Sequence, residues 1–179
     1  MTTWIALLRA VNVGGRKALA SDLNSMMAQL GFENGRTLLA SGNLVFRREG
    51  TTEAELTARL EAESEKRLGF RTDYLVRSAA EWHALVAANP YPGAARDDPA
   101  HLVAMPLKQA PGPDAVESLR AAIVGRERVE AVGRTAYLAY PDGIGESKLT
   151  IAIIEKKLAT RGTARNWNTV LKLDALASS

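Results

Sequence analysis

The order of apolar and polar segments over residues 3–77 most constrains what this chain can fold into. The unbroken apolar run Ile5–Leu8 is typical of a strand covered on both faces, and a glycine-rich basic segment, Asn12–Lys17, follows it. Next comes a stretch with apolar residues at helical spacing, which Ser21 is expected to cap at its start. Two further strands, a second helix and a fourth strand complete a β-α-β-β-α-β order.

This order predicts which loops meet in space. It most often folds as an antiparallel sheet with two helices on one face, in which the third strand lies between the first and second. The first and second strands then run parallel, so the segments that follow them lie at the same end of the sheet. A tight turn at Ser41–Asn43 is expected to join the second and third strands, because Gly and Asn tolerate the positive φ of such turns. We therefore predict that Asn12–Lys17 and Ser41–Asn43 are neighbours.

The second half of the chain repeats the pattern in part. It is predicted as β-α-β-β-α-α, without a fourth strand and with an extra helix at the end. The expected fold class is α+β, with two ferredoxin-like (split β-α-β) halves, antiparallel sheets and a C-terminal helix packed on the second. The expected domains are residues 1–77, a connecting helix and linker at 78–100, and residues 101–179. The missing strand would leave a free sheet edge through which the chain could form a homodimer.

The predicted meeting of the two loops is the best candidate for a binding site. Glycines allow a ligand to approach the backbone closely, and exposed N–H groups near a helix start favour an anion. A phosphate-bearing or carboxylate-bearing small molecule is the expected ligand. The alternative is that both glycine stretches only make tight turns, and the sequence has neither the phosphate-binding nor the dinucleotide-binding glycine motif. The candidate residues are Asn12, Gly14, Gly15, Arg16, Lys17, Ser41, Gly42 and Asn43.

A second polar group precedes the last predicted helix. Arg165, Asn166 and Asn168 are candidate ligand-binding residues, and Trp167 could stack on a base or sugar. The alternative, which we favour for the tryptophan, is that Asn166 caps the helix and Trp167 packs it onto the core. The sequence leaves open whether this group reaches the Asn12–Lys17 segment. It also leaves open whether Tyr91 lines a pocket at the domain junction or holds the linker in place.

Composition limits the chemistry of the chain. There is no cysteine and there are only two histidines, so thiolate and multi-histidine metal sites are excluded and no metal site is expected. No catalytic constellation is recognisable, which leaves open whether the protein is an enzyme, and no cofactor is indicated. No apolar run is long enough to span a bilayer, and a cytoplasmic protein without a membrane partner is expected.

Nucleic acid is a second class of partner to consider. The chain is mildly basic, with 23 positive and 20 negative side chains, but composition does not tell whether the basic residues gather on one face. Single strands bind ferredoxin-like sheets through exposed aromatic side chains. The predicted strands supply only five, without a matching aromatic motif: Trp4, Phe46, Tyr74, Tyr137 and Tyr140.

Four segments of the sequence, in this order, resemble the bacterial domain-of-unknown-function 1697 family. They are Leu8–Gly15, Ser41–Phe46, Ser147–Thr150 and Thr163–Val170, and the resemblance covers nearly the whole chain. The family pattern usually has glycine where Ala10 stands, a departure that bears on the backbone entering the loop. The resemblance implies an α+β fold of two ferredoxin-like halves. It implies no activity and no catalytic residues.

Overall fold

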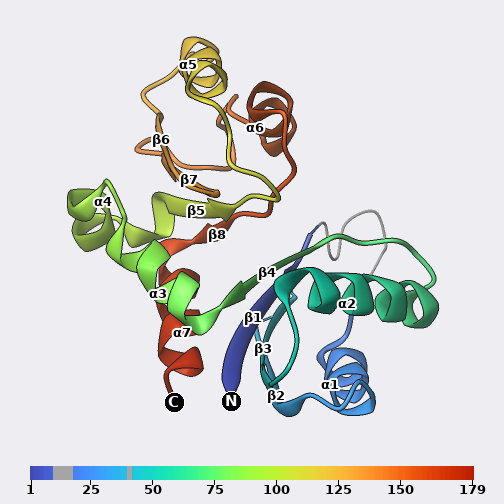
Figure 1. Cartoon of the computed structure of the whole chain (residues 1–179). Helices are drawn as coiled ribbons and strands as arrows, with labels where there is room; N and C mark the ends of the chain where they lie inside the picture. Colours follow the sequence, from blue (N-terminus) through green and yellow to red (C-terminus); the bar gives the residue numbers. More distant parts are fainter. Residues whose placement is uncertain (10–17, 40–41) are drawn as a thin grey trace. The chain divides into compact units, whose positions relative to one another are not determined.

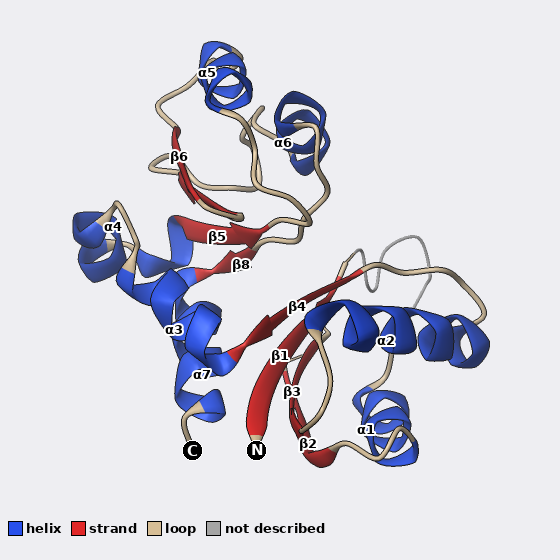
Figure 2. Ribbon diagram, viewed as in Figure 1, coloured by secondary structure: helices blue, strands red, loops and turns tan. Residues whose placement is uncertain are grey.

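The computed structural model describes residues 1–9, 18–39 and 42–179, and within them the chain forms two four-stranded antiparallel sheets and seven α-helices (Figures 1 and 2). This confirms the predicted α+β class. The chain divides into two units, which we call unit 1 (Met1–Ala84 with Lys172–Ser179) and unit 2 (Leu85–Leu171). The division therefore falls inside two helices. This division does not test whether residues 1–77 and 101–179 fold independently, so the expected domain boundaries stay a prediction.

The sheet of unit 1 has the strand order β2-β3-β1-β4, with β3 between β2 and β1 as predicted. Its strands are β1 (Thr2–Leu8), β2 (Glu33–Leu38), β3 (Asn43–Arg48) and β4 (Tyr74–Ser78). Helices α1 (Ala20–Gln29) and α2 (Glu53–Leu68) cover one face (Figure 1). Their apolar residues recur every three or four positions, so each helix buries a single stripe against the strands. The buried helix residues are Leu23, Met26 and Met27 of α1 and Leu56, Leu60 and Ser64 of α2.

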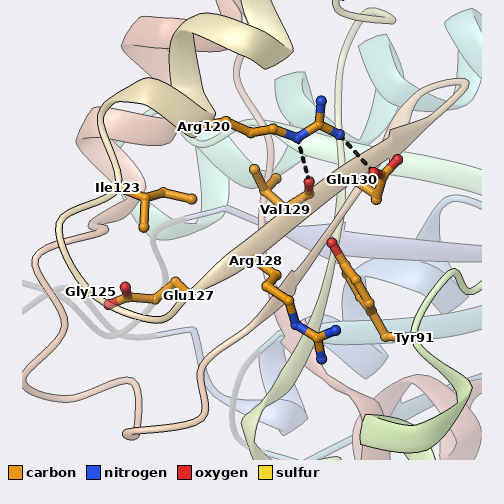
Figure 3. A pocket seen from close by; sticks show the side chains of 8 residues that line it. All are labelled: Tyr91, Arg120, Ile123, Gly125, Glu127, Arg128, Val129 and Glu130. Atoms are coloured by element: carbon orange, nitrogen blue, oxygen red, sulfur yellow. Dashed lines mark hydrogen bonds and ion pairs between the residues drawn. The ribbon is translucent and has the colours of Figure 1, made fainter.

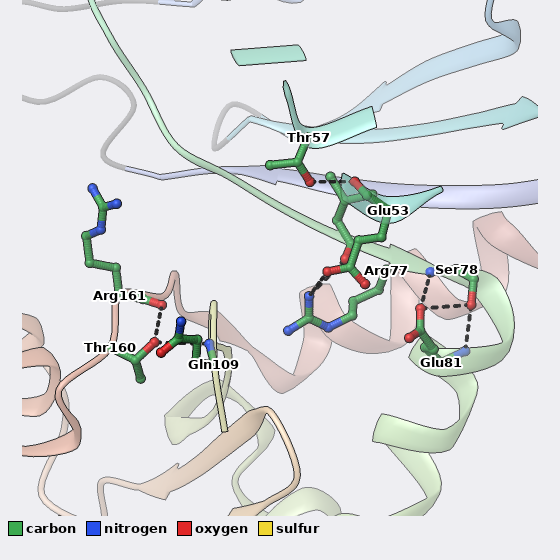
Figure 4. A network of polar contacts seen from close by, with 9 residues as sticks. Glu53, Thr57, Arg77, Ser78, Glu81, Gln109, Thr160 and Arg161 are labelled. Atoms are coloured by element: carbon green, nitrogen blue, oxygen red, sulfur yellow. Dashed lines mark hydrogen bonds and ion pairs between the residues drawn. The ribbon is translucent and has the colours of Figure 1, made fainter. Parts of the chain in front are cut away.

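The helices differ in whether a side chain caps their start. Thr52 and Glu55 form the reciprocal capping box at the start of α2. Ser78 and Glu81 form another before α3 (Ala79–Ala87), as Figure 4 shows. The prediction that Ser21 caps α1 is wrong, because the helix begins at Ala20 and has no side-chain cap. A backbone hydrogen bond from Leu23 N–H to the Leu19 carbonyl extends the helix past the serine.

Unit 2 repeats the complete topology of unit 1. Its sheet has the order β6-β7-β5-β8, in which each strand matches one of β2-β3-β1-β4. The elements are β5 (Leu102–Pro106), α5 (Pro113–Ala121), β6 (Arg128–Val132), β7 (Thr135–Ala139), α6 (Ile151–Leu158), β8 (Arg165–Asn166) and α7 (Trp167–Ala177). The expectation that the second half lacks a fourth strand is wrong, since β8 pairs with β5. With only two residues, both polar, β8 carries no apolar alternation by which a strand is recognised. β8 therefore occupies the sheet edge that was expected to be free, and homodimer formation stays a prediction.

Both faces of the second sheet are covered. On one face the apolar residues of β5, β6 and β7 pack with those of α5 and α6, among them Leu119 and Ile154. On the other, the ring of Tyr137 lies 6.5 Å from that of Trp167, and its hydroxyl donates to the Leu85 carbonyl at 2.6 Å. This confirms that Trp167 packs into the core.

The segment expected to be a plain linker contains helical turns. Helix α4 (Pro92–Asp97) starts with proline, whose missing N–H is tolerated in a first turn, and a 3₁₀ turn, η1 (Pro99–His101), follows. The segment that contains α4 and η1 is therefore regular structure within unit 2. Among the described helices, none is both long and apolar enough to cross a membrane.

Candidate functional site

The predicted meeting of strand ends in unit 1 is present. β1 and β3 pair with Leu7 opposite Asn43, and the Leu8 N–H donates to the Gly42 carbonyl at 2.9 Å. The end of β1 and the start of β3 therefore lie side by side, as the topology predicts. Most of the candidate residues lie outside the described residues, so their part in a site stays a prediction: Asn12, Gly14, Gly15, Arg16, Lys17 and Ser41.

The start of β4 completes this sheet end. The Arg9 N–H donates to the Asp73 carbonyl at 2.9 Å, and the Thr72 hydroxyl donates to the Arg9 carbonyl at 2.8 Å. The side chains of Arg9 and Asp73 also form an ion pair, with 3.7 Å between Nη1 and Oδ2. The aspartate thus offsets the charge of Arg9.

Two candidate residues of the β2–β3 turn are described. Gly42 has φ 74°, the left-handed conformation expected of a glycine in a tight turn. Asn43 is fully buried, and its amide nitrogen donates to the Leu38 carbonyl at 2.8 Å. Asn43 therefore holds the turn together from inside, which is a structural role distinct from the predicted contact with a ligand.

The group before α7 is mostly built into unit 2. Arg165 is buried, and its guanidinium donates to the Thr163 hydroxyl at 2.8 Å and the Ala164 carbonyl at 2.9 Å. Burial lowers the pKa of Arg165 to about 10, so the side chain still carries its charge at neutral pH. Asn166 accepts the Thr169 N–H at 3.0 Å, which confirms its capping role. Of the three candidates only Asn168 is exposed, and the approach of this group to residues 12–17 stays a prediction.

The matching end of the second sheet has the same backbone arrangement with different side chains. The Leu107 N–H donates to the Arg134 carbonyl at 2.8 Å, and the Lys108 N–H donates to the Arg161 carbonyl at 2.8 Å. Thr160 accepts the Gln109 N–H at 3.1 Å through its hydroxyl (Figure 4). By pairing register, Lys108 stands where unit 1 has Arg9, and Arg161 stands where it has Asp73. A pocket of about 360 Å³ opens at this end.

A second pocket of unit 2 lies along β6, the edge strand of the sheet (Figure 3). It has a volume of about 510 Å³. The guanidinium of Arg128 lies over the ring of Tyr91, with its central carbon 4.7 Å from the ring centroid. Tyr91 therefore lines a pocket, and every lining residue belongs to unit 2. The residues are Tyr91, Arg120, Ile123, Gly125, Glu127, Arg128, Val129 and Glu130.

Hydrogen bonds fix two walls of this pocket. Arg120 donates from Nε to the Val129 carbonyl at 3.2 Å and from Nη2 to Glu130 at 2.7 Å (Figure 3), and it also pairs with Glu117. On the other wall, Glu127 accepts the Ser147 hydroxyl at 2.5 Å.

The acid–base properties of the walls follow from these contacts. The Ser147 hydrogen bond is the main cause of the lowered pKa of Glu127. The pKa of Tyr91 is raised, first by burial and then by the nearby negative charge of Glu130. Tyr91 is therefore a neutral hydroxyl at physiological pH.

The sequence contained only part of the signal for this pocket. The alternation Arg128-Val129-Glu130 places both charges on one face of β6, opposite the buried valine. It does not reveal that the segment around Tyr91 covers those charges, because that contact joins residues far apart in the chain.

Two other classes of site find little support in the described ranges 1–9, 18–39 and 42–179. No group of three or more His, Cys, Asp or Glu side chains there is placed to hold a metal ion. The five strand aromatics considered for stacking on nucleic-acid bases are all buried: Trp4, Phe46, Tyr74, Tyr137 and Tyr140. They leave no stacking platform on either sheet.

Comparison with known proteins agrees with the fold. The chain is similar to a solved structure described as that of the conserved bacterial protein SP0830 from Streptococcus pneumoniae, with a TM-score of 0.78 and 19% sequence identity. That similarity covers 100% of this chain and 99% of the other, and it shows the fold alone. A putative chlorite dismutase, TA0507, aligns over 99% of this chain and 100% of its own at 12% identity, but its TM-score of 0.27 carries no argument.

No curated protein matches the sequence. A family model described as "Protein of unknown function (DUF1697)" matches residues 1–137, which is more than half of the chain. The family is one of unknown function, so the match assigns no activity or ligand. With this match and the two-sheet fold, the chain belongs to the DUF1697 family.

Proposed function

We propose that the protein binds a small molecule carrying a phosphate or carboxylate group at the end of the first sheet where β1 meets the β2–β3 turn. The observation that carries this proposal is the hydrogen bond from Leu8 N–H to the Gly42 carbonyl. It joins the two strand ends from which the glycine-rich basic segment and the tight turn extend.

Charge at this end favours an anion. Arg9 is held against Asp73 and contributes little net charge. Arg16 and Lys17 add two positive charges in the sequence, next to glycines that allow the backbone N–H groups to approach a ligand. Asn43 is buried and supports the turn, so we expect the direct contacts with the ligand to come from the other candidates.

A double substitution, Arg16→Ala with Lys17→Ala, tests the proposal. Thermal unfolding would be followed with a panel of phosphorylated and carboxylated metabolites, since a ligand that binds only the folded state raises the melting temperature. We expect the natural chain to be stabilised by at least one anion and the double variant to lose that stabilisation. The matched control is Lys156→Ala with Lys157→Ala, which removes the same charge from exposed positions of α6.

The outcomes separate binding from general charge effects. Loss of stabilisation in the double variant but not in the control supports the proposal. Equal loss in both variants points to non-specific attraction, and unchanged stabilisation in the double variant refutes the site. A nucleic-acid function has no specific observation in its favour, because the strand aromatics are buried.

A further inference from the structure

We propose that the pocket along β6 of unit 2 is a second binding site, for a small molecule that carries a carboxylate or phosphate group, with Arg128 as the residue that binds the anion. All of its lining residues belong to unit 2. It is therefore separate from the site proposed on unit 1, and it does not depend on that proposal.

Arg128 has the geometry of an anion-binding residue. Its guanidinium lies over the ring of Tyr91, with the central carbon 4.7 Å from the ring centroid, which restricts the side chain to a pose beside the pocket (Figure 3). Within the described part of the chain, no hydrogen bond or ion pair occupies the guanidinium N–H groups of Arg128, whose one contact is with the ring of Tyr91. An arginine whose face is stacked and whose edge is open presents the planar fork that matches carboxylate and phosphate oxygens.

Two acidic side chains line the pocket, and each has a hydrogen-bond partner other than Arg128. Glu130 is paired with Arg120 at 2.7 Å. Glu127 accepts the Ser147 hydroxyl and lies against Gly125, where an added Cβ would stand 2.5 Å from its Oε2. Arg120 offsets the charge of Glu130, whereas Oε2 of Glu127 is buried without a hydrogen-bond partner. Neither carboxylate pairs with Arg128, so the guanidinium of Arg128 remains available to an incoming anion.

The remaining groups complete a small-molecule site. The hydroxyl of Tyr91 points toward Glu130 in Figure 3 and is a second donor, because a tyrosine is protonated at neutral pH. Ile123 adds an apolar wall. The volume of about 510 Å³ lies within the range of roughly 300–1,000 Å³ found for small-molecule pockets.

The test is an NMR titration of the full chain with two probes, inorganic phosphate and sodium benzoate, which distinguish a phosphate from a carboxylate ligand. Both would be titrated through the millimolar range at constant ionic strength, so that screening does not change. The variant is Arg128→Gln. The matched control is Arg126→Gln, which removes the same charge two residues away, from an exposed side chain paired with Asp142.

We expect at least one probe to shift the amide signals of Tyr91 and residues 128–130. Arg128→Gln should weaken this binding at least about tenfold, because charge-assisted hydrogen bonds are lost, whereas Arg126→Gln should not. If neither probe shifts these signals, the proposal is wrong. It is also wrong if Arg128→Gln binds a probe with unchanged affinity. The Arg16→Ala, Lys17→Ala variant should retain these shifts, so failure at one site is distinguishable from failure at the other.

Discussion

Replacing Gly162 with alanine would test how the short strand β8 is held against β5. Gly162 lies opposite Leu107 just before β8, and its N–H donates to Glu155 at 3.0 Å. A Cβ on this residue would stand 2.5 Å from the Pro106 carbonyl oxygen and 2.8 Å from Cδ2 of Leu107. The oxygen belongs to the backbone of a central strand, so it cannot move aside without separating the strands.

The expected cost follows from these contacts. Overpacking of this kind destabilises by about 1–3 kcal/mol. Separation would also weaken the hydrogen bonds from Thr163 N–H to Pro106 O at 3.2 Å and from Lys108 N–H to Arg161 O at 2.8 Å, at about 1 kcal/mol for one bond lost. The variant should therefore lose about 2–4 kcal/mol, a drop in melting temperature of roughly 5–15 °C for a chain of this length.

Calorimetry and urea unfolding would measure this loss. Gly145→Ala is the matched control, because an added Cβ there meets nothing within 4 Å and the change should stay within about 0.5 kcal/mol. If both variants unfold at the same temperature, then β8 is not packed against β5 as described. A loss confined to Gly162→Ala agrees with close contact between the two strands.

Three further predictions concern single side chains. Thr52→Ala removes half of the capping box of α2 and should lower the free energy of unfolding by about 1 kcal/mol in urea unfolding, and no change would contradict the capping role. Tyr74→Phe removes the partner of the buried Ser64 hydroxyl, 2.6 Å away, and should cost about 1–2 kcal/mol by the same measurement; an unchanged stability would argue against that bond. Ser147→Ala removes the hydrogen bond that lowers the pKa of Glu127. A carboxylate whose pKa is lowered in the folded state stabilises that state at pH values above the unfolded pKa of about 4.3, and this stabilisation is lost as the pH falls through the folded pKa. The variant should therefore be less stable than the natural chain at neutral pH, and the difference in unfolding free energy should narrow by about pH 3. A gap of equal size at both pH values would disprove the role of the carboxylate.

Local features of the fold were predictable because neighbouring residues decide them. The capping boxes at Thr52 and Ser78 each place a hydroxyl three residues before a glutamate, a pattern that can be recognised in the sequence. The β6–β7 hairpin turns at Gly133, whose φ of 55° suits glycine. The start of α1 was misplaced because a backbone hydrogen bond, not the hydroxyl of Ser21, begins the helix.

Features that depend on distant segments were predictable only where the topology implied them. The strand order implies that the end of β1 lies beside Gly42, and the hydrogen bond between Leu8 and Gly42 confirms it. Strand β8 was missed because two polar residues give no strand pattern. The pocket of Arg128 was missed because Tyr91 reaches it from a segment expected to be a linker.

The hydrogen bond from Arg120 to the Val129 carbonyl has a further consequence for the protein at high concentration. β6 is an edge strand, and an open backbone carbonyl on such an edge can accept a strand from another molecule and start aggregation. Arg120 occupies that acceptor from within its own chain, and Arg128 and Glu130 add charges beside it. An incoming strand would have to displace the guanidinium and place its own backbone next to both charges. The side chain that forms a pocket wall thereby also protects the molecule against intermolecular β-sheet growth.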